Sequence, residues 1–99
     1  MHAMVQTIFI TGASSGFGKL TAILFAKRGW NVVATMRSPA RHEAAFKGLD
    51  NVLLLPMDVT DKRSCTKAVS LAIHRFSRID VLLNNAGYGL FGSFAKLSD

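Results

Sequence analysis

The chain has 99 residues, enough for one small domain with a single thin hydrophobic core. Apolar residues make up 49% of the sequence and charged residues 18%, which is a globular composition and excludes a disordered chain. Twelve Lys and Arg against six Asp and Glu give a net charge of +6, which favours anionic partners such as phosphate ligands, nucleic acid or acidic surfaces.

Apolar runs and helical patterns alternate along the chain. Four short apolar runs predict strands, in chain order Thr7–Ile10, Asn31–Met36, Asn51–Met57 and Ile79–Leu83. The segments between them predict helices, from Phe17 to a stop at Gly29, weakly from Pro39 to Phe46, and from an N-cap at Asp61 to Phe76. Residues at helical spacing mark an apolar face on the first and last of these helices: Phe17, Leu20, Leu24 and Phe25, and Cys65, Val69, Ala72 and Phe76.

This alternation predicts an α/β fold. The strands are short and apolar on both faces, which is typical of a parallel sheet covered by helices on both sides. Ser98 and Asp99 resemble the start of a helix that does not follow, and the fourth strand would leave an apolar edge without a partner. We therefore expect the chain to stop inside a domain, the alternative being a frayed natural C-terminus.

A glycine-rich loop, Thr11–Gly18, joins the first strand to the first helix. This context directs the helix N-terminus, with its free N–H groups and partial positive charge, at a ligand. Gly12 permits a tight turn, Gly16 allows close approach of a pyrophosphate, and Gly18 allows the helix to pack closely. The hydroxyls of Ser14 and Ser15 add hydrogen-bond donors.

Three other interpretations of the loop are weaker. The run Gly12–Gly16 matches the G-x-S-x-G nucleophile elbow of hydrolases, but no earlier loop exists to supply an oxyanion donor. A P-loop requires one residue fewer before Gly18-Lys19 and a Ser or Thr where Leu20 stands. The third alternative is that the glycines only turn the chain.

Two further motifs accompany the glycine loop. Asp58-Val59 follows the third strand and Asn84-Asn85-Ala86-Gly87 follows the fourth. In this order the three motifs resemble the short-chain dehydrogenase/reductase family, which consists of NAD(P)-dependent oxidoreductases on a single Rossmann domain. The resemblance spans essentially the whole chain. It implies that residues 1–99 are the N-terminal part of that domain, with strand order 3-2-1-4 and the cofactor lying across strands 1 and 4.

The resemblance also implies a set of cofactor-binding residues. Around the pyrophosphate and nearby ribose it places Gly12, Ser14, Ser15, Gly16, Phe17 and Gly18. Asp58 would accept a hydrogen bond from the adenine amino group, and Val59 would contact adenine through its backbone. Asn85, Ala86 and Gly87 would line the centre of the cofactor, and Asn84 would help to tie the sheet together.

No catalytic residue is assigned. In the family the catalytic Ser and Tyr-x-x-x-Lys follow the Asn-Asn-Ala-Gly segment. The only tyrosine here is Tyr88, and Gly92 stands four residues later where Lys is required. The chain therefore carries the cofactor half of such an enzyme and lacks its hydride-transfer residues.

The end of the second strand predicts the cofactor. Enzymes that prefer NAD place Asp or Glu there to accept hydrogen bonds from the ribose hydroxyls. This sequence has the neutral Met36, and Arg37 follows it, so a charge-assisted pair with a 2′-phosphate is available, with Arg41 able to assist. We therefore expect NADP(H) rather than NAD.

The sequence thus predicts the NADP(H)-binding segment of a short-chain oxidoreductase that interconverts an alcohol and a carbonyl. The alternative is a non-catalytic half-Rossmann protein that binds a nucleotide or a partner. By resemblance the full-length protein would be a homo-oligomer acting on a small alcohol or ketone. The lone Cys65 is typical of a reducing compartment and predicts a cytoplasmic protein. We expect no nucleic-acid partner, no metal site and no membrane span.

Overall fold

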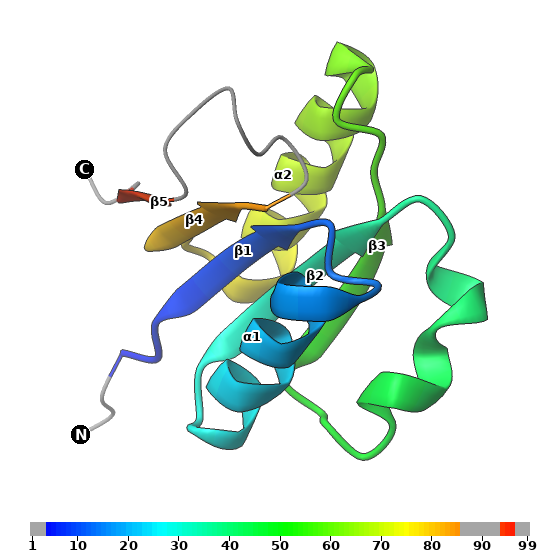
Figure 1. Ribbon diagram of the computed structural model, residues 1–99. Helices are drawn as coiled ribbons and strands as arrows, with labels where there is room; N and C mark the ends of the chain where they lie inside the picture. The colour runs from blue at the N-terminus through cyan, green and yellow to red at the C-terminus, as the bar shows by residue number, and fades with distance from the viewer. Residues whose placement is uncertain (1–3, 86–93, 97–99) are drawn as a thin grey trace.

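The computed structural model describes residues 4–85 and the backbone of residues 94–96, which form one sheet with helices on either side (Figure 1). The strands are β1 (Thr7–Thr11), β2 (Asn31–Met36), β3 (Val52–Pro56), β4 (Val81–Asn84) and β5 (Phe94–Lys96). The helices are α1 (Gly16–Lys27) and α2 (Lys62–Phe76), and two short 3-10 turns, η1 (Pro39–Arg41) and η2 (Glu43–Phe46), precede β3.

The sheet has the strand order β3-β2-β1-β4-β5, which confirms the predicted 3-2-1-4 order of a Rossmann-type fold. β1 lies at the centre and pairs in parallel with β2, where Ile8 is opposite Val32, and with β4, where Ile8 is opposite Val81. The prediction that β4 leaves an unpaired edge is wrong, because β5 pairs with it in the antiparallel direction. The three residues of β5 are too short a run to be recognised as a strand from periodicity.

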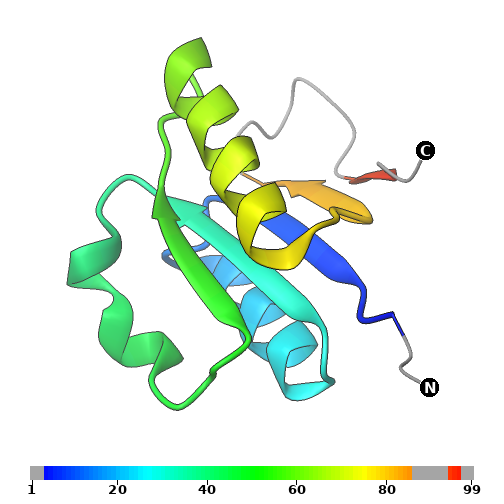
Figure 2. The ribbon, with the colours of Figure 1, turned by 180° about the vertical axis from the view of Figure 1, so that it is seen from behind.

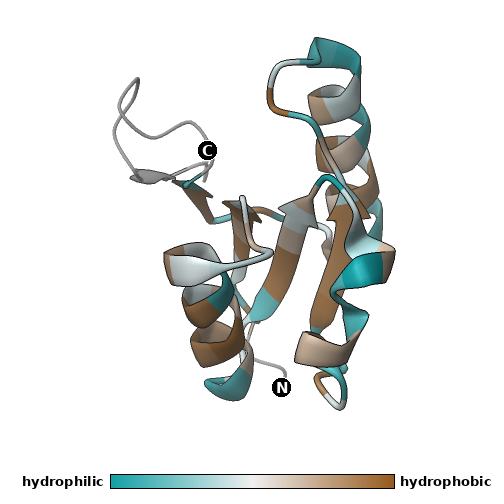
Figure 3. Cartoon of the chain, turned by 45° about the vertical axis from the view of Figure 1, so that its right-hand side comes forward, coloured by the Kyte–Doolittle hydropathy of each residue, from teal (hydrophilic) through white to brown (hydrophobic). Residues whose placement is uncertain are grey.

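The strand side chains alternate between two separate hydrophobic clusters. Ile8 and Ile10 of β1 pack with α1 on one face of the sheet, whereas Phe9 between them packs with α2 on the other. The ribbon seen from behind shows α2 crossing the sheet on the face opposite α1 (Figure 2). The strands between the two helices are largely hydrophobic (Figure 3), which explains why they read as apolar on both faces.

The predicted apolar face of α1 is wrong. Phe17, Leu20 and Leu24 are 62%, 68% and 49% exposed. The buried residues of the helix are Gly18, Thr21, Ala22 and Ala26. Their small side chains let the helix backbone approach the sheet closely, so large residues cannot occupy that face. Of the four predicted residues, Phe25 alone packs against the core, edge-to-face with Trp30.

α2 begins as predicted, because the Asp61 carboxylate accepts a hydrogen bond from the backbone N–H of Arg63 at 3.0 Å. The face that packs on the sheet consists of Cys65, Ala68, Ala72 and Phe76. The prediction of Val69 on this face is wrong: Val69 is exposed, and Ala68 takes the place against the sheet. Here too a small residue lies where helix and sheet approach most closely.

Candidate functional site

The carboxyl ends of β1 to β4 are joined by a row of hydrogen bonds that draws their following loops together. The side-chain N–H of Asn85, after β4, donates to the Gly12 carbonyl, after β1, at 3.0 Å. The backbone N–H of Ala13 donates to the carbonyl of Thr35 in β2 at 3.0 Å. The Met57 N–H, after β3, donates to the Met36 carbonyl at 2.9 Å. The motifs predicted from sequence therefore meet at one edge of the sheet.

The glycine loop requires glycine at three positions for two different reasons. Gly12 and Gly16 adopt positive φ angles of 66° and 58°, which residues other than glycine rarely adopt. At Gly18 the limit is space, since a Cβ would lie 2.4 Å from the Gly12 carbonyl oxygen and 2.7 Å from Nδ2 of Asn85. Gly18 thus lets α1 start directly against the loop and the end of β4. A Cβ at Gly16 would meet no atom within 4 Å, so the loop is open there.

The N-terminus of α1 is equipped for an anion. Ser15 caps the helix in an extended conformation, and its hydroxyl forms no capping hydrogen bond with the residues that the structure describes. The first turn carries no acidic side chain. The free N–H groups and the partial positive charge of the helix end are therefore not neutralised within this first turn.

A pocket of about 290 Å³ opens beside this helix end. Its walls come from the loops after β1, β2 and β3 and from the turn η1: Gly12, Ser14, Thr35, Met36, Arg37, Ser38, Arg41, His42, Met57 and Val59. Among these lining residues two are arginines, one is a histidine and none carries a carboxylate. The pocket is therefore suited to a ligand with negative charge and an apolar portion.

Arg37 and Asp58 face each other across the ends of β2 and β3, with Nη2 of the arginine 3.7 Å from Oδ1 of the carboxylate. Oδ1 also accepts hydrogen bonds from the hydroxyl of Thr60 at 2.7 Å and from its backbone N–H at 2.9 Å. The two Thr60 hydrogen bonds hold the pKa of Asp58 below its ordinary value of 3.8 against the opposing effect of desolvation, and the charge of Arg37 lowers the pKa to a smaller extent. Asp58 is thus an ionised acceptor with a fixed orientation.

The residues predicted for a cofactor site fall into three groups around this edge. Gly12, Ser14, Arg37 and Val59 line the pocket. Ser15, Gly16, Phe17 and Gly18 form the cap and first turn of α1. Asp58 lies beside the pocket and Asn85 contacts Gly12, whereas Ala86 and Gly87 lie outside the described residues. Asn84 accepts a hydrogen bond from the Thr11 hydroxyl at 3.1 Å, in agreement with its predicted role in the sheet.

Several residues in or beside the pocket were not predicted. Thr35 is buried and its hydroxyl donates to the Ile10 carbonyl at 2.8 Å, so it fixes β2 against β1 under the pocket. Thr60 fixes Asp58, and the Asp-x-Thr spacing of an Asx turn was a signal for it. Ser38 and His42 reach the pocket through the η1 turn, which no periodic pattern reveals.

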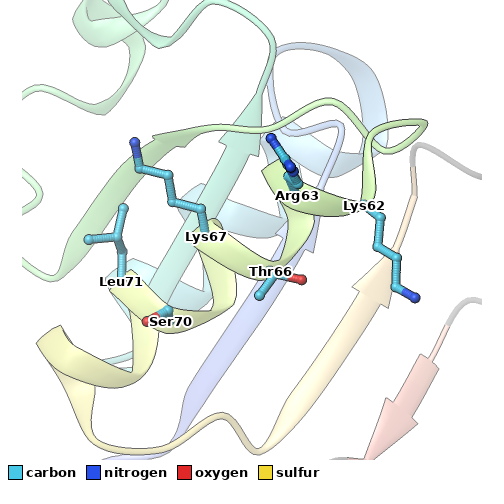
Figure 4. A pocket seen from close by; sticks show the side chains of 6 residues that line it. All are labelled: Lys62, Arg63, Thr66, Lys67, Ser70 and Leu71. Carbon is cyan, nitrogen blue, oxygen red and sulfur yellow. The ribbon is translucent and has the colours of Figure 1, made fainter.

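A second, wider hollow of about 550 Å³ lies along the outer side of α2 (Figure 4). It is lined by Lys62, Arg63, Thr66, Lys67, Ser70 and Leu71. None of these residues belongs to the predicted site. They lie on the side of α2 that faces away from the sheet, whereas Ala68 and Ala72 lie on the side that packs against it. We therefore place the candidate site at the carboxyl edge, where loops of several strands converge.

No helix formed by residues 4–85 and 94–96 combines the length and the hydrophobicity that a membrane span requires. Nor do three or more His, Cys, Asp or Glu side chains gather there in a way that would hold a metal ion.

Comparison with known proteins assigns this geometry to a family. The sequence profile described as short chain dehydrogenase matches residues 6–99. The chain is 43% identical over 88 residues to a 3-ketodihydrosphingosine reductase of Bacteroides thetaiotaomicron, an alignment that covers 89% of this chain and 30% of that protein. The chain thus spans about a third of the length of the curated relatives that it matches.

Two solved structures are similar and differ in their bound nucleotide. A 3-ketoacyl-(acyl-carrier-protein) reductase from Brucella melitensis complexed with NADH superposes with a TM-score of 0.72 at 35% identity, covering 78% of this chain and 32% of that one. The protein ElxO with NADP bound superposes with a TM-score of 0.73 at 31% identity, covering 83% of this chain and 35% of that one.

Proposed function

The chain belongs to the short-chain dehydrogenase family, and we propose that it is the NADP(H)-binding segment of an oxidoreductase that interconverts an alcohol and a carbonyl. Residues 1–99 would form the N-terminal part of a single NAD(P)-binding Rossmann domain. The observation that carries the choice of cofactor is the cationic pocket at the end of β2, where Arg37 follows the buried, neutral Met36.

The proposed cofactor site uses the three groups of residues at the carboxyl edge. The pyrophosphate would lie against the free N–H groups at the start of α1, since an anion there is stabilised by the helix dipole. The residues proposed to surround it and the nearby ribose are Gly12, Ser14, Ser15, Gly16, Phe17 and Gly18. The open space above Gly16 supports this placement, because a ligand must approach the backbone there.

The adenosine end would lie over the ends of β2 and β3. Asp58 is ionised and oriented by Thr60, so its carboxylate suits the adenine amino group as a hydrogen-bond acceptor. Val59 would contact adenine through its backbone. Asn85, Ala86 and Gly87 would line the central region of the cofactor, which is supported for Asn85 by its contact with Gly12.

Arg37 would hold the 2′-phosphate that distinguishes NADP(H) from NAD(H). The Arg37 side chain is 77% exposed and forms only a loose ion pair with Asp58, so it is accessible to a ligand. A hydrogen bond between charged groups contributes about 1.5–3 kcal/mol, and the exposure of Arg37 places its contribution at the lower end of that range. This corresponds to roughly a tenfold preference.

The bound nicotinamide would supply the hydride chemistry, while the residues described here bind and orient the nucleotide. The substrate would be a small alcohol or ketone, as the reductase and dehydrogenase relatives suggest. The non-catalytic alternative is not favoured by these relatives. A cytoplasmic, homo-oligomeric enzyme remains part of the proposal, to be tested by cell fractionation and by sedimentation of the purified protein.

The experiment is to reverse the charge of Arg37 in the protein expressed from its full coding region. Arg37→Glu should lose the preference for NADPH, with the NADPH dissociation constant rising roughly tenfold or more and that of NADH changing little. Arg28→Glu is the matched control, because it makes the same charge change at the exposed far end of α1. Unchanged affinities for both dinucleotides in Arg37→Glu would refute the assignment.

A further inference from the structure

His42 lies in the wall of the cofactor pocket with no role yet assigned to it. On the basis of the proposed function, we propose that His42 and Arg41 form a second wall for the 2′-phosphate in addition to Arg37, and that a proton on His42 makes the preference for NADPH over NADH increase as the pH falls. His42 would thus be a specificity-determining residue whose contribution depends on pH.

The turn that carries these two side chains is held at both ends. Pro39 opens η1 with a fixed φ, and the backbone N–H groups of Arg41 and His42 donate to the carbonyls of Ser38 and Pro39 at 3.1 and 2.9 Å. Four residues after His42, the buried Phe46 is part of the core cluster on the α1 side. The His42 carbonyl also accepts a hydrogen bond from Ala45 at 3.2 Å. These backbone hydrogen bonds therefore fix the position of the His42 backbone beside the pocket.

Apart from His42, the charged side chains that line the pocket are two arginines. Arg37 comes from the end of β2 and Arg41 from η1, and both line the pocket. Asp58 at the end of β3 pairs with Arg37, and Glu43 begins η2 directly after His42. These two arginines, one of them paired with Asp58 beside the pocket, would face a ligand phosphate that carries about −1.5 to −2 charges at pH 7. A protonated His42 would add a further positive charge next to that phosphate.

Histidine is the side chain whose charge ordinarily changes between pH 5 and 8. A 2′-phosphate, in contrast, loses negative charge as the pH falls towards about 6, which by itself weakens binding to arginine. The two effects have opposite signs, so they can be separated. NADH lacks the 2′-phosphate, and its affinity therefore reports the rest of the site and the folding of each variant.

The test is to measure dissociation constants for NADPH and NADH at pH 8, 7 and 6 by equilibrium titration of the protein from its full coding region. In the wild-type protein we expect the NADPH-to-NADH affinity ratio to rise about three- to tenfold from pH 8 to pH 6. In His42→Gln the ratio should stay level or fall over the same range. Arg41→Gln should lower the ratio at every pH and keep the rise.

His74→Gln is the matched control, because it removes an exposed histidine from α2, away from the pocket. It should behave as the wild-type protein. A wild-type preference for NADPH whose pH dependence is unchanged in His42→Gln overturns this proposal and leaves the proposed function standing. Equal binding of NADPH and NADH at every pH overturns both.

Discussion

The two ends of the central strands use charged residues in opposite ways. At the amino end, Asp80 is 3% exposed, forms an ion pair with Arg78 and accepts a hydrogen bond from the Thr7 N–H at 2.8 Å. At the carboxyl end, Asp58 and Arg37 are 42% and 77% exposed and lie 3.7 Å apart. Both ends carry an Arg–Asp pair, but the carboxylate is buried at the amino end and exposed at the carboxyl end.

The difference indicates which pair stabilises the fold and which serves a ligand. Removing one partner of a buried ion pair strongly destabilises the fold, because the remaining charge loses its partner without gaining full hydration. An exposed pair contributes little, since water and salt screen it. Its geometry can instead be used for binding. This contrast leads to four predictions, from the largest expected effect to the smallest.

Removal of the buried carboxylate should have the largest effect on stability. We expect Asp80→Ala to lower the free energy of unfolding by about 3–5 kcal/mol, because it leaves the buried Thr7 N–H without its acceptor and removes the ion pair with Arg78. Denaturant unfolding of the protein measures this. Asp50→Ala, at an exposed turn, is the control and should be close to neutral. A loss under 1 kcal/mol for Asp80→Ala would contradict the assigned role of the amino end.

A methyl group at Gly18 should damage the carboxyl end by crowding. The added Cβ in Gly18→Ala would meet the Gly12 carbonyl oxygen, a backbone atom that cannot move freely. We expect a loss of about 1–3 kcal/mol in unfolding free energy and at least a tenfold loss in dinucleotide affinity. Ala22→Gly is a control within the same helix that should lower stability without the comparable loss of affinity. Unchanged affinity in Gly18→Ala would show that the loop adapts.

Loss of the exposed carboxylate should affect binding more than folding. Asp58→Asn keeps the size of the side chain and removes its charge, so the adenine amino group would lose the charged acceptor that we propose for it. We expect the affinity for both dinucleotides to fall about three- to tenfold and the unfolding midpoint to stay near that of the wild type. Calorimetric titration and thermal unfolding measure the two quantities. If Asp58→Asn lost stability and kept its affinity, the result would contradict the proposed roles of Asp58 in binding and Asp80 in folding.

The smallest effect concerns the titration of Asp58. Its pKa is lowered in the folded protein, so its contribution to stability is present above about pH 4 and is lost as the pH falls through the folded-state pKa. Thr60→Val removes the hydroxyl donor, and we expect it to raise the Asp58 pKa more than Arg37→Gln does. Carboxyl chemical shifts followed by NMR below pH 5 would test the order. A larger rise in Arg37→Gln would contradict it.

Sequence predicted those features that depend on local chemistry. The four strands, the Asp61 cap and the glycine loop follow from periodicity, capping and backbone freedom, and the structure contains them. The helix faces were partly wrong because hydrophobicity marks large side chains, whereas α1 packs on the sheet through Gly18 and Ala22. The same hydrophobic criterion chose Val69 over Ala68 in α2.

The wall formed by Arg41 and His42 could not be predicted in full for a different reason. A side chain on a short 3-10 turn reaches the pocket only through the path of the turn, and this path depends on the Phe46 anchor as well as on local hydrogen bonds. The ion pair between Arg37 and Asp58 likewise depends on β2 and β3 being neighbours. The predicted strand order placed β2 beside β3, but the identities of the two residues did not by themselves indicate that they would pair.

The most direct measurement follows backbone amide shifts in the protein while adenosine 2′,5′-bisphosphate is added. We predict shifts concentrated in three segments at the carboxyl edge: 12–18, 37–42 and 58–60. The amides of Thr7, Arg78 and Asp80 at the opposite end should remain unshifted. Shifts centred on the outer side of α2, or no saturable shift at the carboxyl edge, would contradict the assignment of that edge as the nucleotide site.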